Sequence, residues 1–133
     1  MKLCTFMVIT ALVTLLFGLA FVFVAGPLLS LYGISPTPGG LIVARLFGAS
    51  LIGFAVLTWY ARNAEESEAR RAIIFALFIG ESIGFIVALI SQLSGVVNAL
   101  GWSTVIIYLF FALGFGYFQF AKQSEREVPP GKP

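Results

Sequence analysis

The sequence predicts an all-α integral membrane protein, built as a bundle of four transmembrane helices with both termini in the cytoplasm. Its 133 residues are 59% hydrophobic and only 11% charged, whereas about 25% of the residues of a soluble domain carry charge. Four apolar segments are long enough to cross a hydrocarbon core of about 30 Å. Because lipid offers the backbone no hydrogen bonds, each segment is expected to be helical.

The first predicted span covers residues 3–25. It is longer than the apolar core of about 7–15 residues in a signal peptide, and "FVFVAG" offers no good cleavage site, so we expect a retained helix. The other spans are predicted at 41–60, 72–93 and 100–121. Residues 1–121 would then form a single transmembrane domain, followed by a polar cytoplasmic tail at 122–133.

The connection at 26–40 carries no charge and includes "PLLSLY", which we expect to lie at the membrane interface. Within it, Thr37 and Pro38 are a predicted N-cap and first residue for the second span. In the polar connection that follows the second span, Asn63 and Glu66 resemble a capping box, so the third helix is predicted to begin near Ala64.

The orientation follows from the basic residues, because cytoplasmic loops are enriched in Lys and Arg. All the basic residues outside the spans fall on one side, and the connections on the other side carry none. These residues are Lys2, Arg62, Arg70, Arg71, Lys122, Arg126 and Lys132.

Small residues recur along the predicted spans at the spacing of one helix face, and such residues let membrane helices approach closely. In the third span, Glu81 shares a face with small residues that follow it at spacings of three and four. A compact antiparallel bundle is therefore predicted, with the phenylalanines of "YLFFALGFGYFQF" (108–120) facing lipid. The predicted packing residues are Gly48, Gly80, Gly84, Ala88, Ala112 and Gly116.

Arg45 and Glu81 are the formal charges inside the predicted spans, and ionisable side chains at membrane depth are costly and often functional. At 1.5 Å per residue, Arg45 lies roughly 6 Å below the outer boundary and Glu81 roughly 15 Å from the inner one. About 9 Å then separates them along the normal of a ~30 Å core. Three interpretations stay open for Arg45: an ion pair with Glu81, a structural role in contact with head groups and outer polar side chains, or the binding of an anionic head group or substrate.

Three interpretations also stay open for Glu81. It is a neutral acid hydrogen-bonded to a backbone carbonyl or to Ser82, or part of a proton or cation relay, or a contact to a partner subunit, lipid or pigment. The spans contain no second acid to extend a relay. The residues predicted to make buried polar, ligand, lipid or partner contacts are Glu81, Arg45, Gln92, Asn98 and Ser82.

The sequence holds no histidine and one cysteine, which removes the commonest metal ligand and general base. We predict no metal site, no cofactor held by the chain's own ligands, no catalytic residues and no nucleic-acid partner. The predicted function is a non-enzymatic accessory subunit of a larger membrane complex or homo-oligomer, in contact with lipid and with any quinone or pigment of that complex. The alternative is a small proton- or ion-coupled transporter that uses Glu81 and Arg45.

The segments "GISPTPGGLIVARLFGASLIGFAV" (33–56) and "SGVVNALGWSTVIIYLFFALGFGYF" (94–118) resemble the small four-helix membrane proteins of the bacterial DoxX-like group. The resemblance rests on an arginine that enters the second helix before a run of small residues. It implies the four-helix fold, the topology and a place in the bacterial inner membrane, and it implies no particular activity.

Overall fold

The computed structural model describes residues 1–121, of which 82% are helical, with no strand among them. Four helices are long and apolar enough to cross a membrane, as the sequence predicts. A short helix, α2, follows the first of them, and a π-helical turn, η1, extends the last. The helices are α1 (Leu3–Phe23), α2 (Ala25–Leu31), α3 (Pro38–Ala61), α4 (Glu68–Leu93), α5 (Gly101–Gly116) and η1 (Tyr117–Ala121). The predicted tail at 122–133 lies outside the described residues.

The start of α3 confirms the cap that the sequence predicts. Pro38 is its first residue, and the Thr37 side chain accepts a hydrogen bond from the Gly40 amide at 3.1 Å. The helix therefore begins before the apolar segment does, because a cap and a proline set its first turn.

The predicted capping box before α4 is wrong. Ser67 caps this helix, and its hydroxyl accepts a hydrogen bond from the Arg70 amide at 3.2 Å. The Asn63 side chain is engaged elsewhere, because its Oδ1 accepts a hydrogen bond from Cys4 Sγ at 3.4 Å. The connection thus ties the start of α1 to the turn between α3 and α4.

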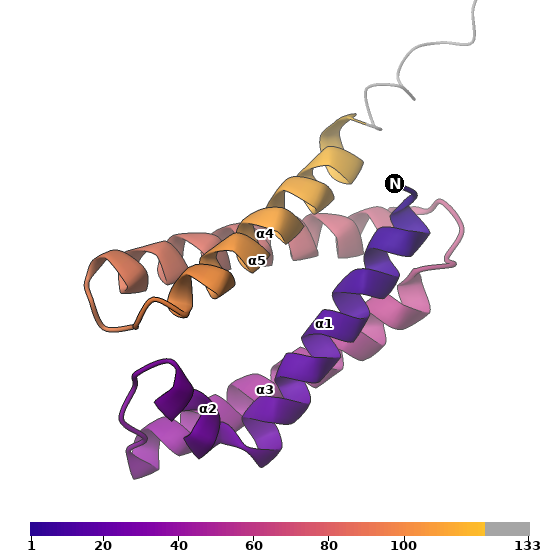
Figure 1. Cartoon of the computed structure of the whole chain (residues 1–133). Coiled ribbons are helices and arrows are strands. Elements are labelled where there is room, and N and C mark those ends of the chain that lie inside the picture. Colours follow the sequence, from indigo (N-terminus) through magenta and orange to yellow (C-terminus); the bar gives the residue numbers. More distant parts are fainter. Residues whose placement is uncertain (122–133) are drawn as a thin grey trace, which may run out of the picture.

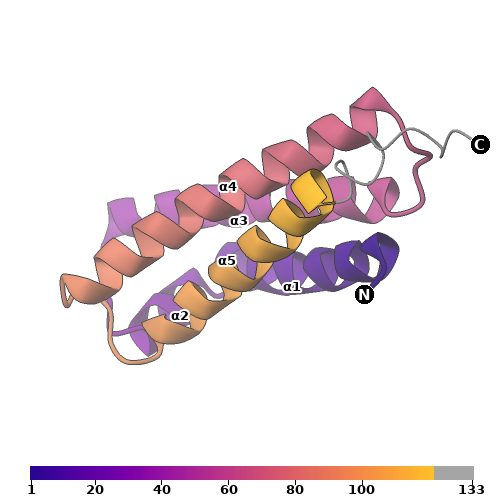
Figure 2. The ribbon, with the colours of Figure 1, turned by 90° about the horizontal axis from the view of Figure 1, so that it is seen from above.

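The four long helices form two antiparallel hairpins, α1 with α3 and α4 with α5, as Figures 1 and 2 both show. Glycines allow the first hairpin to pack closely, because a Cβ at Gly48 would lie 2.8 Å from the Gly18 carbonyl oxygen. In the second hairpin, Gly84 lies against the ring of Tyr108. Ala112 is buried, and a Cβ at Gly116 would lie 3.0 Å from the ring of Phe78.

At one end of the molecule, which we call the terminal end, the hairpins meet in an apolar cluster. This end holds the starts of α1 and α4 and the ends of α3 and η1. The Phe6 ring lies 4.9 Å from that of Phe115, which is fully buried. The expectation that the phenylalanines of 108–120 face lipid is therefore wrong for those turned toward α1. The cluster consists of Leu3, Phe6, Met7, Ala61, Ile74, Leu77, Phe111, Phe115 and Phe118.

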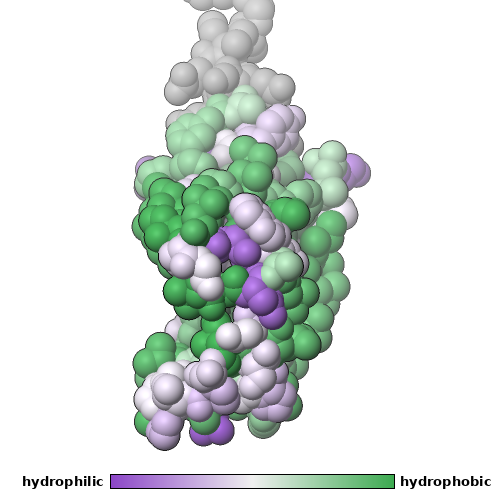
Figure 3. Space-filling model, turned by 60° about the vertical axis from the view of Figure 1, so that its left-hand side comes forward, coloured by the Kyte–Doolittle hydropathy of each residue, from purple (hydrophilic) through white to green (hydrophobic). Residues whose placement is uncertain are grey.

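At the opposite end, the α2 end, polar groups join the hairpins. The backbone N–H of Asn98 donates to the Tyr32 carbonyl at 3.0 Å, and the side-chain Nδ2 of Asn98 donates to the Leu31 carbonyl at 2.9 Å. The Thr104 hydroxyl also donates to the Tyr32 hydroxyl at 3.2 Å. Figure 3 looks toward this end and shows hydrophilic residues gathered between hydrophobic surfaces. The hairpins are thus joined at both ends and not uniformly along their length, unlike the predicted compact bundle.

Candidate functional site

A cavity of about 540 Å³ lies between the two hairpins and is lined by residues of both. Its volume is in the range of small-molecule sites, about 300–1,000 Å³. The terminal-end cluster closes one end of the cavity, where Phe111 belongs to both, and the α2 end closes the other, where Tyr32 and Thr104 share a hydrogen bond and also line the cavity. A cavity placed along the middle of apolar helices is therefore the candidate functional site.

The α1/α3 wall is built mainly from large apolar side chains. Phe17 and Phe21 are four residues apart on α1, so they project from the same helix face, and α3 adds Phe47 and Leu51. The Phe21 and Phe47 rings pack edge to face, with centroids 5.2 Å apart. This contact between α1 and α3 holds two aromatic side chains at the cavity surface.

The α4 wall is the helix face on which the sequence predicts Glu81 together with the small residues that follow it. Glu81, Gly84, Ala88 and Ser91 all line the cavity. The packing predicted for Gly80 is not found, because a Cβ added there would meet no atom within 4 Å. Gly80 therefore faces open space, whereas Gly84 on the same wall is covered by the ring of Tyr108.

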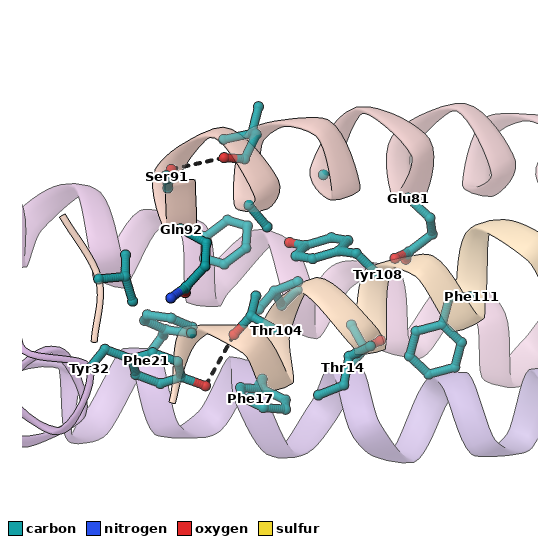
Figure 4. A pocket seen from close by; sticks show the side chains of 18 of the residues that line it. Thr14, Phe17, Phe21, Tyr32, Glu81, Ser91, Gln92, Thr104, Tyr108 and Phe111 are labelled. Carbon is teal, nitrogen blue, oxygen red and sulfur yellow. Dashed lines mark hydrogen bonds between the residues drawn. The ribbon is translucent and has the colours of Figure 1, made fainter. Parts of the chain in front are cut away.

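Glu81 places the only carboxyl group among the lining residues on this wall. The side chain is half-buried and leans toward α5 beside Tyr108 (Figure 4). Ser82 does not form the predicted hydrogen bond with Glu81. The Ser82 hydroxyl instead donates to the Phe78 carbonyl at 2.7 Å. Within residues 1–121, the Glu81 carboxyl has no hydrogen bond and no ion pair.

Arg45 does not share this site. The residues of α3 that face α1 include Ala44 and Gly48, and Arg45 is exposed and does not line the cavity. The structure therefore does not bring Arg45 and Glu81 together, in agreement with the separation in depth that the sequence indicates.

Gln92 and Asn98 meet at the α2 end of the cavity. The Gln92 Nε2 donates to the Asn98 carbonyl at 3.2 Å, whereas its buried Oε1 has no donor among the described residues. The Asn98 Oδ1 accepts from the Leu100 amide at 3.0 Å, so this side chain serves both its own loop and the end of α2. Asn98 is therefore part of the joint between the hairpins, and Gln92 is part of the cavity wall.

Several lining residues were not singled out from the sequence, namely Phe17, Phe21, Tyr32, Thr104 and Tyr108. A signal for the contact of Tyr108 was present in Gly84, because small residues mark the faces at which membrane helices approach each other. The signal for the α1 aromatics was weak, since phenylalanines recur throughout the chain.

The arrangement is suited to binding. Within residues 1–121, no three His, Cys, Asp or Glu side chains gather as a metal site would require. Aromatic and aliphatic walls can hold an apolar molecule, and Glu81 adds one acidic group that can orient it. Comparisons of the chain with protein-family models, curated proteins and solved structures find no match.

Proposed function

We propose that this chain is a non-enzymatic accessory protein of the bacterial cytoplasmic membrane that holds an apolar small molecule between its two hairpins. The observation that carries the proposal is the cavity of about 540 Å³, with its apolar walls and single carboxyl. Lipids, quinones and pigments are the apolar molecules that a bilayer supplies at this depth.

Basic residues support the proposed orientation. Lys2, Arg62, Arg70 and Arg71 all lie at the terminal end, and the connections of the α2 end carry no Lys or Arg. Positive residues favour the cytoplasmic side of a membrane. The proposal therefore places both termini in the cytoplasm and the α2 end outside.

The outward faces of the helices support a place among lipids and other subunits. Leu16, Phe54 and Leu113 are 69%, 51% and 66% exposed. Lipid tails or apolar helices of other subunits, including copies of this chain, can cover such faces. Membership in the DoxX-like group stays a prediction from 33–56 and 94–118, since no comparison bears on it.

Binding is favoured over conduction because both ends of the cavity are occupied by protein. Phe115 and its neighbours fill the terminal end, and the Asn98 hydrogen bonds cross the α2 end. Transport that uses Glu81 and Arg45 is the alternative, and the position of Arg45 outside the cavity disfavours it.

The test is to fill the cavity and ask whether an apolar probe still enters it. Gly80→Phe adds a side chain where a Cβ meets no atom within 4 Å, and Gly53→Phe does the same on α3 away from the cavity. The purified protein is photolabelled in dodecyl maltoside with an uncharged aryl diazirine, and labelled residues are mapped by mass spectrometry.

We expect wild type and Gly53→Phe to show label on Phe17 and Tyr108 that unlabelled probe competes away. Gly80→Phe should lose most of that label while keeping its circular dichroism spectrum. Cavity residues that label no more than the lipid-facing Phe54, or that label without saturation, would contradict the proposal.

A further inference from the structure

Glu81 is the one group on the cavity wall whose charge has no counterpart. Among the residues that line the cavity there is no Lys or Arg, and within residues 1–121 the carboxyl makes no hydrogen bond or ion pair. Arg45 lies outside the cavity. An ionised carboxylate at membrane depth is costly without a positive partner, and no lining residue supplies one, so a cationic ligand would provide that charge.

The cavity that holds Glu81 is rich in aromatic rings. Phe17 and Phe21 lie on α1, and Tyr108 and Phe111 lie on α5 (Figure 4). Aromatic faces attract cations, and they do so more strongly when the cation is desolvated, as in the cages that bind quaternary ammonium groups. One carboxyl near the rings of Tyr108 and Phe111, with Phe17 and Phe21 further along the same cavity, is thus a complementary site for a bulky cation.

The same features exclude other ligand classes. An anion would meet the Glu81 carboxyl and no positive side chain among the lining residues. A small, strongly hydrated cation such as Ca²⁺ needs six to eight oxygen ligands, and the described residues offer no acidic cluster. A neutral molecule would fit the walls, but it would gain from Glu81 at most a hydrogen bond and no charge attraction.

We infer that the molecule held between the hairpins is a lipophilic monocation, bound with its delocalised or quaternary charge beside Glu81 and its apolar groups against the aromatic walls. This inference rests on the proposed function, because it names the class of ligand for the same cavity. It assigns recognition of charge to Glu81 and recognition of shape to the phenylalanines.

The experiment measures how well three molecules of nearly equal shape compete with the uncharged photoprobe at Phe17 and Tyr108. They are tetraphenylphosphonium, which is cationic, tetraphenylsilane, which is neutral, and tetraphenylborate, which is anionic. Wild type is compared with Glu81→Gln, with Glu81→Asp, and with Glu68→Gln as a matched control, since Glu68 is exposed at the start of α4 and does not line the cavity.

In wild type and in Glu68→Gln, we expect the cation to compete at a concentration at least tenfold below that of the neutral compound, with the anion weakest. Glu81→Gln should remove this preference, so that cation and neutral compound compete equally. Glu81→Asp should keep the preference in reduced form, because it keeps the charge. Labelling of Glu81→Gln by the uncharged probe shows that its cavity is still formed.

The inference is overturned if the wild-type cavity binds the neutral compound as well as the cation, or if the cation preference survives in Glu81→Gln. Either result leaves the proposed function standing, because the cavity would still bind an apolar molecule. Should the uncharged probe itself fail to label the cavity, the proposed function fails instead. If Glu81→Gln does not fold, the inference is tested by whether the wild-type cavity prefers the cation over the neutral compound.

Discussion

The two ends of the molecule join the same two hairpins by opposite means. At the terminal end the contact is apolar, with Phe6 and Phe115 packed ring against ring. At the α2 end the contact is polar, with Asn98 hydrogen-bonded to the carbonyls of Tyr32 and Leu31. A joint made of close packing depends on shape over many atoms, whereas a joint made of a few hydrogen bonds depends on single donors and acceptors.

The contrast predicts at which end the two hairpins separate first. Lipid tails are as apolar as phenylalanine, so packing in the membrane stabilises through dispersion contacts and not through hydrophobic transfer. Interhelical hydrogen bonds in membranes contribute about 0.6 kcal/mol each. Because a buried phenylalanine makes dozens of contacts, we expect the terminal end to hold the hairpins together and the α2 end to separate first.

The largest effect is expected from Phe115→Ala, which removes a fully buried ring from the terminal-end joint. Phenylalanine-to-alanine changes in protein cores cost about 3–5 kcal/mol, and lipid lowers the transfer part of that cost. We expect the free energy of unfolding to fall by about 2 kcal/mol. The measurement is SDS-induced unfolding in mixed micelles, followed by circular dichroism.

Phe54→Ala is the matched control, because the Phe54 ring is 51% exposed on α3. Its free energy of unfolding should change by less than about 0.5 kcal/mol. Equal losses in the two variants would show that lipid contact, and not the terminal-end cluster, stabilises these rings.

A smaller effect is expected from Asn98→Ala, which removes the hydrogen bond to the Leu31 carbonyl and the bond from the Leu100 amide. We expect a loss of about 1 kcal/mol, because the bond to Leu31 between the hairpins contributes about 0.6 kcal/mol and the local bond from Leu100 adds about 0.5 kcal/mol. The change should also widen the distance distribution between spin labels at Ser30→Cys and Val96→Cys in a Cys4→Ser background, measured by pulsed electron resonance.

Ser94→Ala serves as the control for this variant, because the Ser94 hydroxyl donates to the Ser91 carbonyl within one hairpin. Its distance distribution should match that of the parent. If Phe115→Ala widened the distribution at the α2 end as much as Asn98→Ala does, the two joints would not be separable and the comparison would fail.

Much of the fold could be predicted from the sequence because its signals are local. Apolar length and low charge predicted the four long helices, and Thr37 before Pro38 predicted the start of α3. The start of α4 was missed because Asn63 and Ser67 are both suitable caps, and the contact of Asn63 with Cys4, far away in the sequence, decides between them.

The cavity could be predicted only in part. The spacing along α4 correctly placed Glu81 and Gly84 on one face, but a face of small residues is compatible with close packing and with an open space. Which of these forms depends on how far α1 stands from α4, and the Phe6 ring and the Asn98 hydrogen bonds set that separation at the two ends. Such distances depend on long-range contacts that no local pattern encodes.

The smallest effect is expected from Tyr32→Phe, which removes the hydroxyl that accepts from Thr104 and leaves the Asn98–Tyr32 backbone bond in place. We expect a loss of about 0.6 kcal/mol, the typical value for one interhelical bond in a membrane. Thr104→Val should cost a similar amount, and the double variant should cost little more than either one, because both remove the same bond. Fully additive losses in SDS unfolding would show that the hydroxyls do not interact. The α2-end joint would then rest on Asn98 alone.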